Sequence, residues 1–406
     1  MVTTAPPPIV TAAATPAPDR TWRRAVGIGL AAFVVSRLCV VAGAAVRASQ
    51  VAIDFNTRFG KFKSSTPLES GNGLVTGVFA QWDGKWYLAI IRDGYPRSIP
   101  PDITYFQPEA RAAFFPLYPL TARVLNWVLP ADETLAALGL NVVLGAVAVV
   151  LVGVLARRLY DVDIAERAMV LFAVFPGSFV LSYAYAEAML IVLACACLWL
   201  LLEERWLLAG VVAALATATR PNGVALVAAC AVASFLAIRQ RRNWASLVAP
   251  MLAPIGFVAF QLFLLAHTDE RAAWFRVQRE AWREGTSFGA TAVSNTLSFL
   301  TDPLSSPRFA LTAASMVALG MGLWCLWRRR LPWPMIAYVA VVVALMLLPA
   351  TVTARPRFVF TAFPLFIAVA AWWPRTERSV WSLVMVASGG GLAALTALYG
   401  VFGAIP

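Results

Sequence analysis

Long apolar segments recur along almost the whole chain and constrain its fold more than any other feature. Stretches of roughly 20 apolar residues, the length of a helix that crosses a ~30 Å hydrocarbon layer, recur from residue 25 to residue 402. Of the 406 residues, 60% are hydrophobic and only 13% are charged. Backbone polar groups in lipid need internal partners, so such segments form helices. We therefore expect an all-α, polytopic membrane protein.

Small groups of arginines between the apolar segments predict its orientation, because short cytoplasmic loops are rich in Lys and Arg. These groups are Arg20/Arg23/Arg24, Arg157/Arg158, Arg239/Arg241/Arg242, Arg328/Arg329/Arg330 and Arg375/Arg378. Placing all of them in the cytoplasm fits about eleven spans, namely 25–47, 136–155, 168–184, 187–202, 206–219, 223–238, 245–265, 309–327, 334–350, 358–373 and 379–402. The third, fourth and fifth are short, and Pro176 predicts a break in the third. We expect a multi-pass protein of the plasma membrane with a cytoplasmic N-terminus.

The domain organisation is simple. Residues 1–19 are rich in Ala, Pro and Thr, and we interpret 1–24 as a disordered cytoplasmic tail. Residues 25–406 then form a single transmembrane domain, in which 48–135 is a long extracytoplasmic loop. The segment 25–47 is too long for the apolar region of a signal peptide, so we expect it to be an uncleaved first span.

Composition also argues against several classes of function. The net charge of +12 is spread among short loops instead of forming one basic face, which argues against nucleic acid as a partner. The five cysteines lie in apolar runs and His267 is the only histidine, so we expect no metal site and no disulfides. No glycine-rich nucleotide-binding loop is apparent.

The first outer loop carries the candidate for catalysis. A loop of this length usually has a function, and its aromatic content argues against disorder. Asp83, in the segment Gln81-Trp82-Asp83-Gly84, is placed to take a proton from an incoming hydroxyl as a general base. The alternative is that Asp83 caps a short helix, whose face would consist of Trp82, Trp86, Tyr87 and Ile90.

Other outer turns carry charged groups. Glu187 either binds a sugar hydroxyl or is a favourable partner of a helix dipole. Arg220 with Asn222, and Arg355 with Arg357, lie on the outer side against the local charge bias. Guanidinium groups bind phosphate through paired hydrogen bonds, so a phosphate partner is one interpretation. The other is that the arginines extend to lipid headgroups.

An amphipathic stretch near residue 280 is a further candidate. Trp274, Val277 and Ala281 are spaced to face one way, so the stretch 275–283 most simply lies on the membrane surface. Gln278 and Trp282, four residues apart, can also contact a sugar by hydrogen bonding and ring stacking. His267 borders this stretch and is either an interfacial polar residue or a catalytic one.

Several of these segments together resemble one family. They are Trp82-Asp83-Gly-x-Trp-Tyr87, Asp93-Gly-Tyr95, Phe114-Phe115-Pro-Leu-Tyr-Pro119, Tyr185-Ala-Glu187, Arg220-Pro-Asn-Gly223, Gln278-x-x-x-Trp282-Arg283 and Arg357-Phe-Val-Phe-x-x-Phe-Pro364. Their order resembles the PIG-V-like mannosyltransferases in a bacterial form, over residues 25 to 373. Gln81 and Ala186 stand where the family pattern has arginine and serine.

The resemblance implies a GT-C glycosyltransferase fold with the active site on the outer face. It implies a polyprenyl-phosphate-mannose donor, an inverting transfer, and Asp83 as base. The acceptor stays open between a glycan, a glycolipid and a protein hydroxyl. Metal dependence stays open. The substrate-binding residues that we predict are Trp82, Tyr87, Tyr95, Tyr185, Glu187, Arg220, Asn222, His267, Gln278, Trp282, Arg355 and Arg357.

Alternative functions predict other patterns. A lipid or polysaccharide transporter predicts polar residues at the bilayer midplane and usually an internal repeat, whereas we find only Arg37 there and no evident repeat. A charge at that depth is costly, so Arg37 should face the bundle interior and have a partner. A non-catalytic scaffold gives no reason for carboxylates, arginines and aromatics to gather on one side. A transferase that uses another polyprenyl-phosphate sugar, such as a pentose, is a closer alternative.

Overall fold

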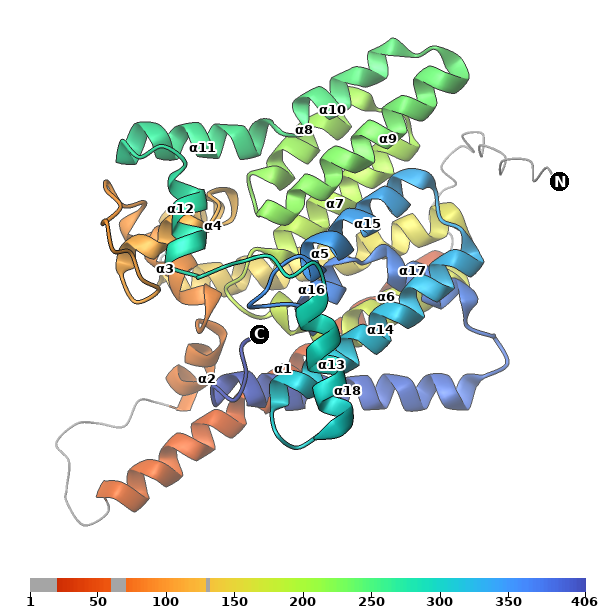
Figure 1. The fold of residues 1–406 in the computed structure, drawn as a ribbon. Helices are drawn as coiled ribbons and strands as arrows, with labels where there is room; N and C mark the ends of the chain where they lie inside the picture. The colour runs from red at the N-terminus through yellow and green to blue at the C-terminus, as the bar shows by residue number, and fades with distance from the viewer. Residues whose placement is uncertain (1–19, 60–70, 129–131) are drawn as a thin grey trace.

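The structure is a computed structural model that describes residues 20–59, 71–128 and 132–406, and this part of the chain folds into a bundle of helices (Figure 1). Within it, six helical stretches are long and apolar enough to cross a membrane. They lie within α1 (Arg20–Phe59), α5 (Glu133–Leu159), η3–α9 (Pro221–Gly223 and Val224–Arg241), η4–α10–α11 (Trp244–Leu247, Val248–Leu252 and Ile255–Thr268), α14 (Pro307–Arg329) and α18 (Arg378–Gly400). The expected all-α membrane fold is confirmed.

Shorter apolar helices complete the bundle. They are α7 (Glu187–Leu202), α8 (Trp206–Thr217) and α15 (Trp333–Leu347). Two further expected spans are interrupted, as α6 (Val162–Val174) with η2 (Pro176–Leu181) and α16 (Pro356–Thr361) with α17 (Pro364–Trp372). The break at Pro176 confirms the one predicted there, because proline lacks the amide hydrogen that would continue α6.

The two interrupted segments pack closely against each other. A Cβ on Gly177 of η2 would collide with the carbonyl oxygen of Pro356, at the start of α16. Phe175 and Phe360 stack across the same contact with ring centroids 6.4 Å apart. Glycine at position 177 therefore lets the η2 and α16 backbones meet, and this contact fixes where the residues at the start of α16 lie.

The described part of the expected outer loop is helical rather than open. It contains α2 (Gly71–Phe79), α3 (Asp83–Asp93), η1 (Pro108–Ala113) and α4 (Leu117–Val128). A hydrophobic cluster separate from the main core joins α3, η1 and α4 to α11 and α12 (Ala273–Glu280). The elements α3, η1 and α4 thereby form a packed layer at one end of the bundle (Figure 1).

Three boundaries or placements differ from those expected. The helix α1 begins at Arg20, so residues 20–24 are not part of a disordered tail; residues 1–19 lie outside the described residues. It also continues to Phe59 instead of ending at 47, because no glycine or proline interrupts residues 47–59. The apolar face of α12 packs on protein instead of membrane, since Trp274 Nε1 donates to the Ala113 carbonyl at 3.0 Å.

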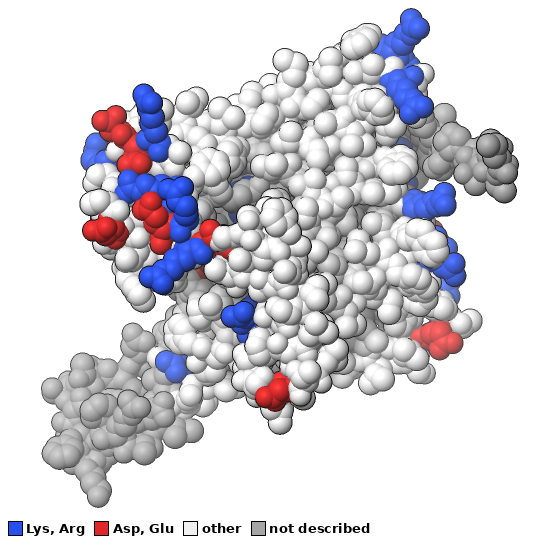
Figure 2. All heavy atoms as spheres, viewed as in Figure 1, with Lys and Arg blue, Asp and Glu red and all other residues white. Residues whose placement is uncertain are grey.

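Charged side chains gather at two ends of the face shown in Figure 2. Basic and acidic groups mix over the α3 and α12 end, whereas mainly basic groups lie at the opposite end, and the surface between is largely uncharged. Such a division suits a protein whose middle faces lipid.

The helix α13 (Ala290–Thr301) lies against the first part of α14.

Candidate active site

Two ion pairs lie at the junction of the bundle and the layer formed by α3, η1 and α4. Arg357 Nη1, on α16, donates to Asp83 Oδ2, at the start of α3, at 2.7 Å. Arg220 Nη1, before α9, lies 2.6 Å from Glu187 Oε2, the first residue of α7. Glu187 is 1% exposed and Arg220 12%, so the second pair is buried. Four residues predicted separately from the sequence thus lie in one site.

Two tyrosines connect the pairs. Tyr87, one turn along α3 from Asp83, lies within electrostatic range of all four charged groups. The Arg357 guanidinium lies 5.8 Å from the centre of the Tyr185 ring. Burial is the main cause that raises the pKa of both tyrosines well above the usual value, so both are neutral hydroxyls at pH 7.

The ion pairs keep both arginines charged. Burial by itself lowers the pKa of Arg357, but the carboxylates of Asp83 and Glu187 outweigh it and leave that pKa above its usual value. Burial likewise lowers the pKa of Arg220, and the Glu187 carboxylate is the main cause of its net rise. Each guanidinium is therefore a permanent cation.

Arg355 is a third buried cation at the same place, and it differs from the other two. Its side chain is 2% exposed, and Nη1 donates to the Thr312 hydroxyl of α14 at 2.7 Å. No carboxylate lies within 4 Å of it among the described residues, and Nε has no acceptor there. Burial, with the charges of Arg308 and Arg357, lowers its pKa to about 10, although the Tyr399 hydroxyl raises it. It is still protonated at pH 7.

Many polar atoms of this site lack a hydrogen-bond partner within the described part of the chain. They are the hydroxyls of Tyr185, Tyr183 and Tyr399, both oxygens of Glu187, Nη1 of Arg220 and Nε of Arg355 and Arg357. The Glu187–Arg220 contact is close, but its geometry is not that of a hydrogen bond. Buried polar groups usually have partners, so this concentration marks a place suited to a polar ligand.

The turn before Asp83 is held in an unusual conformation. Trp82 has φ 58°, which is uncommon for a bulky residue, and precedes the first residue of α3. Its Nε1 donates to the Tyr399 carbonyl of α18 at 3.2 Å, and its ring packs on Phe402. A short helix does begin at Asp83, as the capping alternative expected, but Trp82 holds the N-cap position. The hydrogen bond found for the Asp83 carboxylate within the described residues is the one to Arg357. The C-terminal helix thereby anchors the turn that presents Asp83.

Asn141 is a residue that the sequence analysis missed. From the middle of α5, Nδ2 donates to the Tyr185 carbonyl at 2.8 Å and also to the Tyr183 carbonyl. The Ala184 amide in turn donates to the Phe79 carbonyl at 2.9 Å, next to the turn before α3. The available signal was a single asparagine in the otherwise apolar stretch 135–156, where a buried polar group needs partners.

An aromatic cluster adjoins the site through Tyr87. Trp282 lies 5.7 Å from Trp86 and 4.7 Å from Tyr105, as ring centroid distances. Phe114 contacts both Trp282 and Tyr87. The predicted Trp282 is therefore connected to the ion pairs through contacts of Phe114 with Tyr87. The predicted Gln278 is half-buried on the neighbouring α12.

Three other predicted residues have local structural contacts. The Tyr95 hydroxyl donates to the Phe114 carbonyl at 2.6 Å, and its ring packs on Phe260 and Phe263. His267 Nε2 lies 3.4 Å from the Tyr95 carbonyl oxygen, with its ring stacked on Phe263. Asn222 is half-buried in η3, two residues after Arg220.

Arg37 has the partners expected for a charge inside a span. Its guanidinium donates to the Ser178 carbonyl and hydroxyl, both at 2.8 Å, and to the Ser182 hydroxyl at 2.9 Å. It therefore ties α1 to η2, and its hydrogen bonds are made within the protein. Within the described residues no three His, Cys, Asp or Glu side chains are placed to hold a metal ion.

Comparison with solved structures finds several that are similar to this chain. ArnT from Cupriavidus metallidurans in the apo state has a TM-score of 0.51 at 15% identity, over 77% of this chain but 57% of ArnT. ArnT bound to undecaprenyl phosphate has a TM-score of 0.49 at 13% identity, over 80% of this chain and 73% of that one. An Archaeoglobus fulgidus oligosaccharyltransferase tethered to an acceptor peptide has a TM-score of 0.40 at 13% identity, over 95% and 54%.

The apo ArnT likeness shows that the fold is of the GT-C type. No relative among functionally curated proteins matches the sequence. The sequence model of glycosyltransferase family 87 (GT87), however, matches residues 115–351, which include Glu187 and Arg220 but neither Asp83 nor Arg357. It is a glycosyltransferase family, as expected, and the PIG-V-like resemblance stays a finer prediction. Since the match covers more than half of the chain, this protein belongs to glycosyltransferase family 87.

Proposed function

We propose that this glycosyltransferase moves mannose from a polyprenyl-phosphate-mannose donor to a hydroxyl of an extracytoplasmic glycan, glycolipid or protein, with inversion. The resemblance of the motif order to PIG-V-like mannosyltransferases supports mannose as the sugar. ArnT, the GT-C neighbour, has also been crystallised bound to undecaprenyl phosphate, which is a lipid phosphate of the proposed kind. The arginine distribution supports an outward position of the site.

The observation that carries the proposal is the excess cation beside the two ion pairs. Asp83 and Glu187 offset Arg357 and Arg220, which leaves Arg355 without a carboxylate. A buried charge without a counter-ion is costly, and a phosphate group would provide one. We therefore assign the donor phosphate to Arg355, with Arg357 next to it.

An apolar groove near Arg355 suits the lipid part of such a donor. The groove has a volume of about 590 Å³ and is lined by Phe288, Gly289, Ala290, Val293, Ser294, Leu297, Met316 and Leu347. Met316 follows Thr312, the hydroxyl partner of Arg355, by four residues on α14, so both lie on one helix face. A phosphate at Arg355 would leave its polyprenyl chain along α13, α14 and α15.

Asp83 is the proposed general base. Arg357 binds Oδ2 of its carboxylate, whereas Oδ1 has no hydrogen-bond donor among the described residues. The side chain is 25% exposed, so a hydroxyl can reach it. In the proposed step the acceptor oxygen bonds to the anomeric carbon as the carbon–phosphate-oxygen bond breaks. Asp83 takes the hydroxyl proton, and the lipid phosphate leaves as an anion stabilised by the arginines.

The test is a transfer assay in membranes supplied with radiolabelled polyprenyl-phosphate-mannose. Asp83→Asn keeps the shape of the side chain but not its basicity, and we expect it to lower the rate by ~10²–10⁴-fold. The control is Asp93→Asn, at the other end of α3, where the carboxylate pairs with exposed Arg92. This change should leave the rate close to that of the wild type.

Two results would contradict parts of the proposal. Wild-type activity of Asp83→Asn at an equal protein level would remove Asp83 as the base. Transfer from a pentosyl donor, with none from the mannosyl donor, would retain the polyprenyl-phosphate chemistry but show that mannose is wrong.

A further inference from the structure

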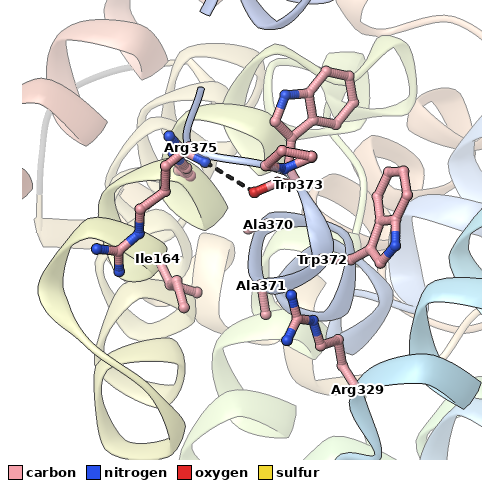
Figure 3. Close-up of a pocket in the computed structure, with 9 residues that line it drawn as sticks. Ile164, Arg329, Ala370, Ala371, Trp372, Trp373 and Arg375 are labelled. Atoms are coloured by element: carbon pink, nitrogen blue, oxygen red, sulfur yellow. Dashed lines mark hydrogen bonds between the residues drawn. The ribbon is translucent and has the colours of Figure 1, made fainter. Parts of the chain in front are cut away.

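A second candidate site lies far from Asp83. A cavity of about 440 Å³ is lined by Ile164, Arg167, Arg329, Ala370, Ala371, Trp372, Trp373, Pro374 and Arg375. Figure 3 shows Ala370 and Ala371 between Ile164 on one side and Arg329 with Trp372 on the other. The volume lies within the ~300–1,000 Å³ typical of ligand pockets. Three arginines from separate segments therefore meet around one hollow.

The three arginines differ in how far their guanidinium groups are already engaged. Arg375 is held by two carboxylates, with Nη2 2.5 Å from Asp161 and Nη1 3.4 Å from Asp163. Arg167 donates through Nη1 to the Trp373 carbonyl at 3.1 Å, the bond drawn in Figure 3. For the Arg329 guanidinium, no acceptor or carboxylate partner is found within the described ranges. Arg329 and the rest of Arg167 are thus available to an anion.

The place of the cavity in the bundle indicates what kind of anion can reach it. Arg329 ends α14, and Arg308 near the other end contributes its carbonyl to Arg355. These two arginines are 21 positions apart on one helix. That is a rise of roughly 32 Å, about the thickness of the hydrocarbon layer. The cavity is therefore at the opposite membrane surface from the Asp83 site, at the level where lipid headgroups lie.

The lining chemistry suits a phosphate that belongs to a lipid. One guanidinium group can donate two parallel hydrogen bonds to two oxygens of the same phosphate. Basic pockets between helices at the cytoplasmic surface are typical sites for acidic lipid headgroups. Tryptophan prefers the same interfacial depth, and Trp372 and Trp373 contribute to the wall of the cavity. The adjoining Trp324 contacts Trp372 with ring centroids 4.8 Å apart.

We propose that this cavity binds the phosphate of an anionic membrane phospholipid, with Arg329 and Arg167 as its ligands. Arg375 takes no direct part, because Asp161 and Asp163 already neutralise it. The bound lipid would link α6, α14 and the end of α17, which contribute the lining residues. The site is separate from the transfer reaction and does not depend on the proposed donor.

The test measures lipid binding to the full-length protein in detergent. Thermal unfolding is followed while short-chain phosphatidylglycerol, phosphatidylcholine or inorganic phosphate is added, at about 0.3 M salt to screen surface charge. We expect saturable stabilisation by phosphatidylglycerol alone. Arg329→Gln should weaken the apparent affinity by about tenfold, which is the effect of losing a charged hydrogen-bond donor.

The matched control is Arg328→Gln, which removes the same charge from the neighbouring residue outside the cavity. It should change the affinity by less than about twofold under the same screening. An equal loss in both variants would show attraction by surface charge and overturn the site. If inorganic phosphate binds as well as phosphatidylglycerol does, the proposal that the site takes a lipid is wrong. If Arg329→Gln leaves the affinity for phosphatidylglycerol unchanged, Arg329 is not a ligand.

Discussion

Removing one partner of the buried Glu187–Arg220 pair should lower the unfolding free energy strongly, because the remaining charge stays buried. At 2.6 Å, two unit charges attract by about 6 kcal/mol with an effective dielectric constant of 20. Desolvation offsets part of that attraction while the pair is intact. When one partner is removed, the other stays buried without a counter-ion, and the typical cost is about 3–5 kcal/mol. We expect this loss of unfolding free energy for Glu187→Gln and for Arg220→Gln.

The double variant distinguishes the ion pair from two independent contacts. With both residues changed to glutamine no uncompensated charge is left, so the double variant should lose much less than the sum of the single losses. The assay is unfolding of the purified protein by titration with denaturing detergent, followed by circular dichroism. Additive losses, or single losses below about 1 kcal/mol, would refute the buried-pair reasoning.

The chain offers a matched exposed pair as control. Arg241 and Glu204 are 2.5 Å apart, but their side chains are 47% and 41% exposed. Solvent screens such a pair, so Arg241→Gln should cost no more than about 1 kcal/mol. The difference between the two pairs then measures the effect of burial.

Three further predictions follow from contacts around the site. Asn141→Ala should lower the unfolding free energy by about 1–3 kcal/mol, because the Tyr183 and Tyr185 carbonyls lose their donor. The control is Asn126 of α4, whose Oδ1 has no hydrogen-bond partner among the described residues; Asn126→Ala should change the unfolding free energy by no more than ~0.5 kcal/mol, and denaturation of both variants checks this. Gly177→Ala should lower the unfolding free energy by about 1–3 kcal/mol and reduce the transfer rate, since the added methyl displaces α16 and its Arg357. A wild-type transfer rate in a variant that has lost this stability would contradict the link between the two. Trp82→Phe removes the hydrogen bond to Tyr399 and should lower the transfer rate with a stability loss of only about 0.5–1.5 kcal/mol, to be compared with exposed Trp127→Phe.

The sequence predicted the helical class because it depends on local composition. Long apolar segments specify helices in lipid whatever they pack against, and Pro176 specifies a break from its own missing amide hydrogen. The limits of α1 were less predictable, since a helix continues into polar sequence until something stops it. The placement of α12 was also missed, because its apolar face suits a membrane surface and a protein surface equally.

Motif order identified most of the charged residues of the candidate site, but not their partners. Asp83, Glu187, Arg220 and Arg357 were each candidates, and the sequence offered phosphate or lipid headgroups as the partners of the arginines. The structure pairs these arginines with the two carboxylates and leaves Arg355 as the cation without one.

Local sequence thus determined which segments are helices and which residue types line the turns between them. Only the tertiary structure decided which charges neutralise each other, because Asp83 and Arg357 are 274 positions apart and their contact depends on how α3 and α16 pack. The same holds for Asn141 and for Arg329, whose surroundings come from distant segments. Electrostatic energy depends on distance and burial, and neither is a property of a short stretch of sequence.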